Sequence, residues 1–533
     1  METGAVNLHS PWASLLLEAG PDSLAIVAWG GPLDPASAQS GTGPRRVRDR
    51  GAVHGSMSLP DTITVVPSHA AGSPLRPGVL GHRSDGSAWA PVFSTTRLEH
   101  DDQRVVIHAV DEVARLSLRT DISLTELLSV VVTLTNESDS PYWLDGLLPT
   151  VELPPRAAEL IGFDGRWANE LQPTRRPWTS GTSLVENRRG RTSHDHFPLI
   201  VAGTAGFDEW TGEVWCLHLA WSGNHQMLVH ALTDGRRAIQ FGELLHPGEV
   251  VLGPGESYTS PPLLGSYSGA GLTPASWRFH RHLRALPNAP KGPRPVSANT
   301  WEAVYFDHQP ERLELLASAA ASVGIERFVL DDGWFSSRRN DTSGLGDWTV
   351  STDVYPDGLE PLIDHVRSLG MQFGLWVEPE MANPDSDLLR VHPDWVLATP
   401  GYPTAVGRNQ VVVDLTNDDA FAAVLAAIDE LLNRYQIDYL KWDMNRDHVQ
   451  ASSPDGRAAS HRQTLALYRM IDTLRERHRG VEIESCSSGG GRMDLGIVGR
   501  TQRVWVSDTN DALDRQRIQR WASLFLAPEY VGA

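Results

Sequence analysis

Cysteine is nearly absent from this sequence, with two in 533 residues, and this scarcity is the first constraint on the protein. Cys216 and Cys486 lie far apart, so they form neither a disulfide framework nor a cysteine-rich zinc site, which favours a reducing compartment. No apolar run reaches the roughly 20 residues of a membrane-spanning helix. Residues 1–20 lack a basic segment before their short leucine run, so we expect no signal peptide and a cytoplasmic protein.

Basic residues are also in deficit, because 46 Lys and Arg stand against 66 Asp and Glu, giving a net charge of −20. That charge repels backbone phosphates and anionic lipids, which argues against nucleic-acid and membrane partners. The sequence is instead rich in apolar residues (41%) and tryptophan (18), as in a large globular protein. Most tryptophans are expected in the core, but flat amphipathic rings also suit a sugar-binding protein.

The first half of the chain, from about residue 55 to 270, consists of short alternating runs separated by turn residues. A period of two predicts antiparallel strands, here Arg104 to Val110, Ala114 to Ile122, Leu127 to Thr135, Glu213 to Trp221 and Met227 to Leu232. We therefore expect a β-sandwich domain over residues 1–275. A helix from Trp277 to Leu286 and a run of prolines predict a linker at 276–296.

After residue 297 short apolar runs alternate with amphipathic helices. The predicted strands are Trp301 to Tyr305, Arg327 to Leu330, Met371 to Val377, Gln410 to Val413, Ile437 to Lys441, Val481 to Glu484 and Gln502 to Val506. The predicted helices include Pro310 to Val323, Asp419 to Tyr435, Gln463 to His478 and Asp511 to Leu526. Repeated βα units imply a parallel sheet, so we expect a catalytic domain over 297–533.

Polar residues come after each predicted strand, and their positions favour a closed barrel over an open sheet. They are Asp307, Asp331 and Asp332, Glu378 and Glu380, Asp414, Asp443 and Asn445, Cys486 and Ser487, and Asp508. A helix cap explains any single one of them, but the strand ends of a barrel converge on one catalytic mouth, which explains the set. No Gly-x-Gly-x-x-Gly turn supports an open dinucleotide-binding sheet. The expectation is a (β/α)8 TIM-type barrel.

Two carboxylates at this mouth are the candidate catalytic residues. Lys441, Asp443 and Asn445 share one face of their strand, and the adjacent lysine favours an ionised Asp443, as a nucleophile requires. A structural Lys–Asp pair is the alternative. Asp508 ends a later strand beside Trp505, and a second acid across the mouth would raise its pKa, as a general acid requires. Two acids with separated pKa values are typical of glycoside hydrolases.

Further residues fit a sugar pocket. Asp331 and Asp332 could hold two neighbouring hydroxyls, and Trp376 could form a wall against the ring. An Asp–Asp pair also binds hard cations, but no further ligand lies near in sequence, so we expect neither a metal ion nor a cofactor. Cys486 has no histidine among the strand-end residues, which favours packing or hydroxyl contact over nucleophilic catalysis.

The motifs of the second half together resemble glycoside hydrolase family 36, the microbial α-galactosidases. They are Asp331 to Phe335, Gly346 to Trp348, Trp376 to Met381, Gly407 to Gln410, Leu440 to Arg446, Cys486 to Arg492 and Ser507 to Ala512; Arg189 to His194 and Trp221 to Asn224 match more loosely in the first half. The resemblance implies a β-supersandwich before the barrel, Asp443 as nucleophile and Asp508 as acid/base. It also implies that Asp331, Asp332, Trp376, Arg408, Lys441, Asn445, Cys486 and Trp505 line the galactose subsite.

The resemblance further implies a small-molecule α-galactoside substrate, a homo-oligomer for the full-length protein, and exclusion of an N-acetyl group by Cys486. Family members continue beyond this sequence, so we expect a barrel that lacks most of strand 8 and the segments after it. The leading hypothesis is hydrolysis of α-galactosides such as melibiose and the raffinose series with retention of configuration. The alternatives are a raffinose-synthase-type α-galactosyl transglycosylase and a catalytically inactive sugar-binding fragment.

Overall fold

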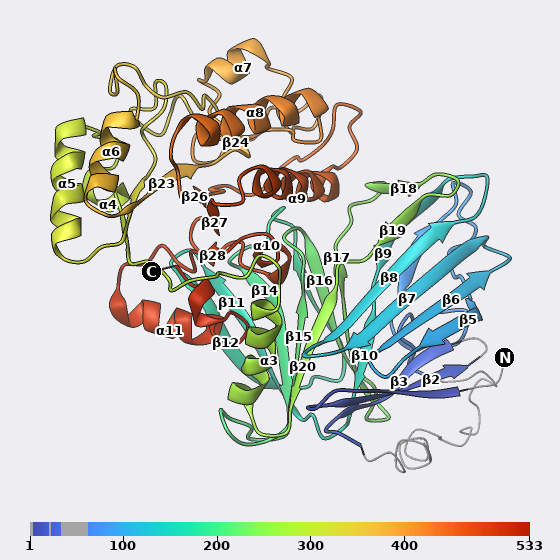
Figure 1. Cartoon of the computed structure of the whole chain (residues 1–533). Coiled ribbons are helices and arrows are strands. Elements are labelled where there is room, and N and C mark those ends of the chain that lie inside the picture. Colours follow the sequence, from blue (N-terminus) through green and yellow to red (C-terminus); the bar gives the residue numbers. More distant parts are fainter. Residues whose placement is uncertain (1–3, 21–22, 34–61, 533) are drawn as a thin grey trace.

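The computed structural model describes residues 4–20, 23–33 and 62–532. A β-rich N-terminal part lies beside a C-terminal part in which helices surround short parallel strands (Figure 1). The hydrophobic cores of the two parts are continuous. The two-part architecture predicted from sequence, a β-sandwich followed by an α/β catalytic domain, is therefore confirmed.

Antiparallel sheets make up the N-terminal domain. The largest sheet contains β5 (Ser94–His100), β6 (Arg104–Asp111), β7 (Leu116–Leu124), β8 (Leu128–Asn136), β11 (Glu159–Arg166), β12 (Asn169–Pro177), β14 (His196–Gly203), β15 (Val214–Leu219), β19 (Ser257–Thr259) and β20 (Leu263–Ser268). Its order is β12-β11-β14-β15-β20-β8-β7-β6-β5, with β19 paired to β8. The five strands predicted from alternation in this half all form within a few residues of their predicted bounds, four of them in this sheet and Met227 to Leu232 in a smaller one.

Smaller sheets complete the N-terminal domain. They contain β1 (Gly4–His9), β2 (Ser14–Gly20) and β3 (Ser23–Gly30); β4 (Val79–His82), β9 (Tyr142–Leu147) and β18 (Val250–Leu252); and β10 (Thr150–Leu153), β13 (Gly181–Asn187), β16 (His225–Ala231) and β17 (Arg237–Glu243). Burial alternates strictly along β7 and β8, because side chains of period two send every second residue into the core. Most of the segment predicted to lack a signal peptide forms β1 and β2; residues 1–3 lie outside the described residues.

The connection to the second domain begins with helix α3 (Leu272–Arg284), which packs against β15 and β20 through its buried face. The proline-rich stretch comes next, and the first parallel strand, β21 (Ser297–Asn299), starts just beyond it. The domain boundaries at residues 275 and 296 stay predictions. Within the described ranges, no helix is long and apolar enough to cross a membrane.

Six parallel strands form the sheet of the second domain. They are β21, β22 (Arg327–Leu330), β23 (Gln372–Val377), β26 (Tyr439–Trp442), β27 (Glu482–Ser485) and β28 (Arg503–Val504), hydrogen-bonded in that order. A single parallel bridge from Val531 to Val504 continues the sheet past β28. Short apolar strands buried on both faces are what a helix-covered parallel sheet requires.

The helices alternate with these strands and lie outside them (Figure 1). They are α4 (Trp301–Val304), α5 (Pro310–Ser322), α6 (Glu360–Ser368), α7 (Asp387–Val391), α8 (Asp418–Arg434), α9 (Ser460–Arg477), α10 (Leu495–Val498) and α11 (Ala512–Ala522), followed by the 3-10 turn η1 (Pro528–Tyr530). The Asn417 side chain caps α8 by accepting hydrogen bonds from Asp419 N and Ala420 N, which satisfies donors that a helix start leaves free. The four helices predicted in this half all form, as α5, α8, α9 and α11.

The prediction of a strand from Trp301 to Tyr305 is wrong. The first barrel strand is β21, four residues upstream, and Trp301 begins helix α4. Small and polar residues form β21, so it lacks the apolar signal that marks a strand, whereas Trp301 of α4 makes T-shaped ring contacts with Tyr305 and Phe306, which follow the helix. Asp307 is consequently exposed and paired with Arg312 instead of lying at the end of the first barrel strand.

The predicted fourth barrel strand, Gln410 to Val413, is also wrong. Its residues form β25 (Val411–Val412), which pairs antiparallel with β24 (Met381–Ala382) outside the parallel sheet. The sheet passes directly from β23 to β26. Val411, Val412 and Val413 are apolar because they are buried, although they do not belong to the parallel sheet. A short apolar run of this kind has the same sequence pattern as a barrel strand.

A buried polar cluster joins the two domains. Asp494 caps α10 by accepting from Gly496 N (2.8 Å) and Ile497 N (3.3 Å), and it also accepts from the hydroxyls of Ser222 (2.9 Å) and Thr192 of the N-terminal domain. A buried carboxylate is tolerated only when it is this well bonded. The domains are thus fixed against each other close to the strand ends.

Replacing Asp494 with alanine is expected to destabilise the protein by about 3 kcal/mol, since several charge-assisted hydrogen bonds are lost and their buried donors are left unpaired. Asp511→Ala is the matched control, because the Asp511 carboxylate caps the exposed start of α11 in the same way, by accepting from Leu513 N and Asp514 N of its own helix. It should cost about 1 kcal/mol. Apparent melting temperatures at one scan rate measure both, and equal shifts would show that the domain contact contributes nothing.

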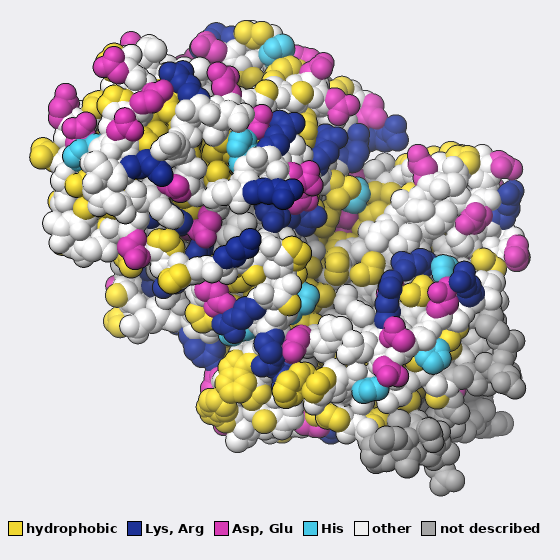
Figure 2. Space-filling view, viewed as in Figure 1, with side chains coloured by type: hydrophobic (Ala, Val, Ile, Leu, Met, Phe, Trp, Pro, Cys, Tyr) yellow, Lys and Arg dark blue, Asp and Glu magenta, His cyan; other side chains and the backbone are white. Residues whose placement is uncertain are grey.

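On the face shown in Figure 2, acidic and basic side chains are interspersed. The hydrophobic side chains that this face exposes gather mainly along its lower edge.

Candidate active site

A cavity of about 850 Å³ extends along the parallel strands, from first residues such as Arg327 and Tyr439 to the segments that follow the strands. Strand-end residues line it together with Trp167, Arg191 and His194 of the N-terminal domain. Seven of the eight predicted subsite residues and both predicted catalytic acids lie on its wall: Asp331, Asp332, Trp376, Arg408, Lys441, Asn445, Trp505, Asp443 and Asp508. A barrel mouth covered by a second domain therefore forms the site.

Asp443 directly follows β26, is 6% exposed and is held through both carboxylate oxygens. Its Oδ2 accepts from Asn445 Nδ2 (2.6 Å) and from the indole of Trp376 (3.2 Å). Its Oδ1 accepts from Met444 N (2.8 Å) and Ser488 N (3.2 Å). These donors fix the orientation of the carboxylate.

The electrostatic surroundings keep Asp443 ionised. Burial alone would raise the pKa of its carboxyl, but the Lys441 ammonium and the hydrogen bonds from Asn445 and Cys486 outweigh burial, so the pKa of Asp443 lies below its usual value. Lys441 itself has a raised pKa, because attraction to Asp331 and other anionic neighbours exceeds the opposing effect of its burial. An ionised, oriented carboxylate is suited to nucleophilic attack.

Asp508 lies beyond β28 and faces the same cavity. Two indole groups donate to it: Trp505 Nε1 to Oδ1 (3.0 Å) and Trp167 Nε1 to Oδ2 (2.9 Å). Burial, and after it the negative charge of Asp443, raises the pKa of Asp508. The pKa of Asp443 is therefore lowered and the pKa of Asp508 is raised, so that the first carboxyl can be ionised while the second still holds a proton.

Asp331 and Asp332 lie directly after β22 and are each bound to a cation. Lys441 Nζ lies 2.8 Å from Asp331 Oδ2, which Asn299 Nδ2 also contacts at 2.6 Å. Arg338 pairs with both oxygens of Asp332 at 2.9 and 2.8 Å. Each carboxylate therefore already faces a cation of the chain, an arrangement that does not favour a cation cage.

The other predicted subsite residues surround these carboxylates. Trp376 is buried in β23, and its ring stacks on Phe335 at 6.3 Å. Trp505 lies under the Lys441 ammonium (5.9 Å) and the Arg515 guanidinium (4.4 Å). Arg408 is exposed at the cavity wall with a left-handed backbone (φ 51°). The pocket thus combines aromatic surface with charged edges, as sugar sites do.

Cys486 is the predicted site residue that does not line the cavity. It is 1% exposed, it is a free thiol, and burial raises its pKa well above the ordinary value. Its thiol bonds to the Asp443 carboxylate. A protonated thiol is a poor nucleophile, so packing or contact stays the prediction for this residue.

Glycines after Cys486 bring backbones together at the floor of the site. A Cβ atom on Gly489 would come 2.7 Å from Asp508 N, and one on Gly490 would come 2.4 Å from Val506 O. Gly489 also has φ +76°. Close packing against the segment that carries Asp508 therefore explains these glycines without a phosphate site.

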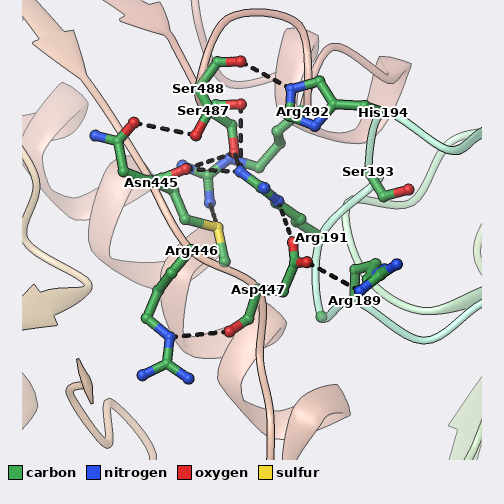
Figure 3. A network of polar contacts seen from close by, with 12 residues as sticks. Arg189, Arg191, Ser193, His194, Asn445, Arg446, Asp447, Ser487, Ser488 and Arg492 are labelled. Atoms are coloured by element: carbon green, nitrogen blue, oxygen red, sulfur yellow. Dashed lines mark hydrogen bonds and ion pairs between the residues drawn. The ribbon is translucent and has the colours of Figure 1, made fainter. Parts of the chain in front are cut away.

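The N-terminal domain contributes residues to this site that the sequence did not identify as functional. Figure 3 shows Arg191 pointing toward Asp447 and Ser487. Its Nε donates to Asp447 Oδ1 (2.9 Å), and its Nη1 donates to Ser487 Oγ (2.9 Å) and Met444 O (2.8 Å). His194 Nε2 donates to Ser488 O at 2.7 Å. The loops around Asp443 are therefore held from the neighbouring domain.

Trp167 is a second contribution of that domain. It lies at the tip of the β11–β12 hairpin, 59% exposed, and its indole reaches Asp508. Glu378, directly after β23, is one of the strand-end acids of the sequence and has no predicted role in the site. It accepts hydrogen bonds from Asn445 N and from Gln410 Nε2 (3.0 Å). Burial raises the pKa of Glu378 to about 8. Asn445 is thereby fixed through its backbone by Glu378 and through its side chain by Asp443.

A barrel mouth that holds one ionised and one protonatable carboxylic acid beside an aromatic pocket defines a glycoside hydrolase. Comparison with known families specifies which one. The model "Melibiase" matches residues 257–533, and the model "Glycosyl hydrolase family 36 N-terminal domain" matches residues 22–253. The chain belongs to glycoside hydrolase family 36 and its enzyme class is that of the α-galactosidases.

Individual relatives agree with this assignment. An α-galactosidase of Escherichia coli is 44% identical over 531 residues, covering 99% of this chain and 74% of the relative. AgaA of Geobacillus stearothermophilus is 38% identical over 402 residues, covering 73% of this chain but 55% of AgaA. The chain thus spans between about half and three quarters of the length of these relatives.

Solved structures show the same fold. Variants of AgaA in complex with stachyose and with raffinose each superpose with a TM-score of 0.92 at 30% identity, over 99% of this chain and 79% of theirs. The α-galactosidase of Lactobacillus brevis superposes with a TM-score of 0.93 at 26% identity, over 100% of this chain and 76% of its own. The arrangement of the two domains is therefore common to the family.

Proposed function

We propose that the protein hydrolyses terminal non-reducing α-D-galactosyl residues of melibiose and raffinose-type oligosaccharides by double displacement, with Asp443 as nucleophile and Asp508 as acid/base. The observation that carries this proposal is the opposite displacement of the two pKa values across one cavity. The AgaA structures with raffinose and stachyose support the choice of substrate.

In the first step Asp443 attacks the anomeric carbon of the galactosyl unit while Asp508 donates its proton to the glycosidic oxygen. The bond to the leaving sugar breaks, and a covalent galactosyl-enzyme forms with inverted configuration. Trp376 and Asn445 donate hydrogen bonds to the Oδ2 atom of Asp443. The attacking carboxylate is therefore held in one orientation and cannot rotate. This preorganisation lowers the entropic part of the barrier.

In the second step Asp508, now ionised, takes a proton from water, and the water oxygen attacks the anomeric carbon. The ester bond to Asp443 breaks, and galactose leaves with its original configuration, as in retaining glycosidases generally. The indoles of Trp505 and Trp167 donate to Asp508 and stabilise its ionised form in this step. The same residue thus serves as acid and then as base.

Galactose recognition is assigned to the eight residues predicted from the sequence: Asp331, Asp332, Trp376, Arg408, Lys441, Asn445, Cys486 and Trp505. Asp331 and Asp332 accept from two neighbouring hydroxyls, and the Lys441 ammonium contacts the sugar beside them. Trp376 packs on the apolar side of the ring. Cys486 lies behind the residues that line the cavity, and its thiol hydrogen-bonds to Asp443. In this position it limits the space near the 2-hydroxyl of the sugar.

Substrate hydrolysis tests the proposal directly. We expect galactose release from melibiose and raffinose-type substrates, and at least roughly 10²-fold lower kcat/KM on matched α-glucosides and α-N-acetylgalactosaminides, because polar groups built for one hydroxyl pattern are left unpaired by another. Adding sucrose as acceptor separates hydrolysis from transfer. Galactosyl transfer that exceeds release to water would replace the proposal with a transglycosylase.

Three further expectations from the sequence belong to the proposal. The protein works in the cytoplasm, which the two free, buried cysteines support. It acts without a metal ion or cofactor, since the two acids supply the proton transfer and the nucleophile. It assembles as a homo-oligomer and has neither a nucleic-acid nor a membrane partner, in keeping with its net charge of −20.

A further inference from the structure

Glu170 of the N-terminal domain is a buried carboxylic acid directly behind Asp508. It lies on β12, three residues after Trp167, and is 1% exposed. Its Oε1 accepts from Gly490 N at 3.4 Å, and its carboxyl interacts with the Ser507 hydroxyl. A Cβ atom on Gly489 would come 2.9 Å from that Oε1. Glu170 therefore lies against both the glycine loop and the segment that carries Asp508.

The charged groups around Glu170 do not neutralise it. His194 Nε2 lies 3.9 Å from Oε1, but burial lowers the pKa of His194 to about 4 and its Nε2 donates to Ser488 O. Arg515 of α11 attracts Glu170 electrostatically, but its guanidinium donates its hydrogen bond to Ser507 O at 2.8 Å. Asp508 adds negative charge. Within the described part of the chain, Glu170 Oε2 is buried without a hydrogen bond.

An ionised carboxylate in this position would be costly, because burial without a paired cation disfavours charge. Burial raises the pKa of Glu170 to about 7. At mildly acidic pH the side chain is therefore neutral, and it adds no repulsion when Asp508 ionises between the two steps of the reaction.

We propose that Glu170 is a positioning residue for the acid/base, a protonated carboxylic acid that fixes the Ser507–Asp508 segment against the N-terminal domain. The inference rests on the proposed role of Asp508. With Trp167 donating to Asp508 Oδ2 from the same hairpin, the N-terminal domain contacts the side chain of the acid/base and, through Glu170, the preceding residue Ser507. The hairpin is thus part of the proton-transfer machinery and not only a cover.

Leaving-group dependence tests the positioning role. Glu170→Ala should lower kcat/KM on raffinose about tenfold, a fraction of the roughly 10²- to 10⁴-fold that a general acid contributes, and less than about twofold on an aryl α-galactoside whose leaving group needs no proton. Glu170→Gln, neutral and of the same shape, should restore raffinose hydrolysis to within about twofold. Equal losses on both substrates, or a Gln variant as impaired as the Ala variant, would overturn the proposal.

The pH dependence of stability tests the protonation state. A carboxyl with a raised pKa favours the folded state below about pH 4.5, and that contribution is lost as pH rises toward 7. Glutamine cannot ionise, so Glu170→Gln should match the parent protein at pH 4.5 and melt several degrees above it at pH 8. A constant difference at both pH values would show that Glu170 is not a neutral buried acid.

Two controls separate this inference from the function on which it rests. Asp164→Asn changes an exposed carboxylate of the same hairpin, paired with His196, and should leave both substrates unaffected. Asp508→Ala should depend on the leaving group far more strongly than any Glu170 variant. If Asp508→Ala reduces both substrates equally, the acid/base assignment fails; if it behaves as expected while Glu170→Ala leaves raffinose hydrolysis unchanged, only the role of Glu170 fails.

Discussion

Asp443→Gly is expected to lower kcat on α-galactosides by at least about 10⁴-fold, the order seen when a covalent nucleophile is removed. The carboxylate that attacks the anomeric carbon is gone, while its donors Asn445 and Trp376 remain. Glycine also leaves a space that a small anion can enter. Azide should therefore restore turnover of an aryl α-galactoside and yield the β-galactosyl azide, with inverted configuration.

The matched control is Asp438→Asn. Asp438 lies just before the other end of β26, where it accepts from Arg367 and from Phe373 N, outside the cavity lining. It should retain near-normal activity. An Asp443→Gly variant with full activity, or azide rescue that gives the α-azide, would remove Asp443 from the nucleophile role.

Asp508→Ala is expected to show the second largest effect. Hydrolysis of raffinose should fall by about 10³-fold, because its leaving sugar needs a proton, whereas the first step with an activated aryl α-galactoside should fall much less. Azide attacks the galactosyl-enzyme in place of water and should give the α-galactosyl azide, with retained configuration. Comparing the two substrates and the anomeric form of the azide product measures the role of Asp508.

The pH profile provides a second test of Asp508. Its pKa is raised by burial and by Asp443, so the protonated form persists to higher pH than for an exposed aspartate and is lost as pH rises through that pKa. In the parent enzyme this loss gives the alkaline fall of kcat/KM on raffinose. The alkaline decrease of kcat/KM should be absent in Asp508→Ala. If the pH profile is unchanged by the substitution, the decrease comes from the titration of another group.

Much of the site was predictable because strand-end position is a local property of sequence. Asp443 and Asp508 each come after a strand whose apolar residues identify it, and the alternation of Lys441, Asp443 and Asn445 places them on one face. The antiparallel strands β7 and β8 were predictable for the same reason, since their alternation is visible without knowing their neighbours. Local patterns identify such elements well.

Elements whose pattern is weak or ambiguous were predicted wrongly. β21 has three residues, Ser297–Asn299, and none is a strong strand former, whereas the aromatic residues Trp301 and Tyr305 just after it give a strand-like pattern in and beside helix α4. Val411 and Val412 are buried like barrel residues but pair with β24 instead. Asn299, which donates to Asp331 at the end of the true first strand, was missed in consequence.

The N-terminal contributions could not be derived from local pattern at all. Trp167 meets Asp508 across 341 positions of sequence, and Arg191 meets Asp447 across 256. An exposed tryptophan at a hairpin tip carries no signal of the domain that it will contact, and Arg191 is marked only by the looser family resemblance of Arg189 to His194. Only the docking of the two domains, which Asp494 helps to fix, brings them to the cavity.

The proposed mechanism depends above all on a covalent bond between Asp443 and the sugar. A fluorinated α-galactosyl donor that slows the second step should trap the intermediate, and peptide mass spectrometry can locate it. We expect one galactosyl adduct, on the peptide that contains Asp443 and on that residue. An adduct on another residue would contradict the mechanism. So would the absence of an adduct together with β-galactose, the inverted anomer, as the first product released.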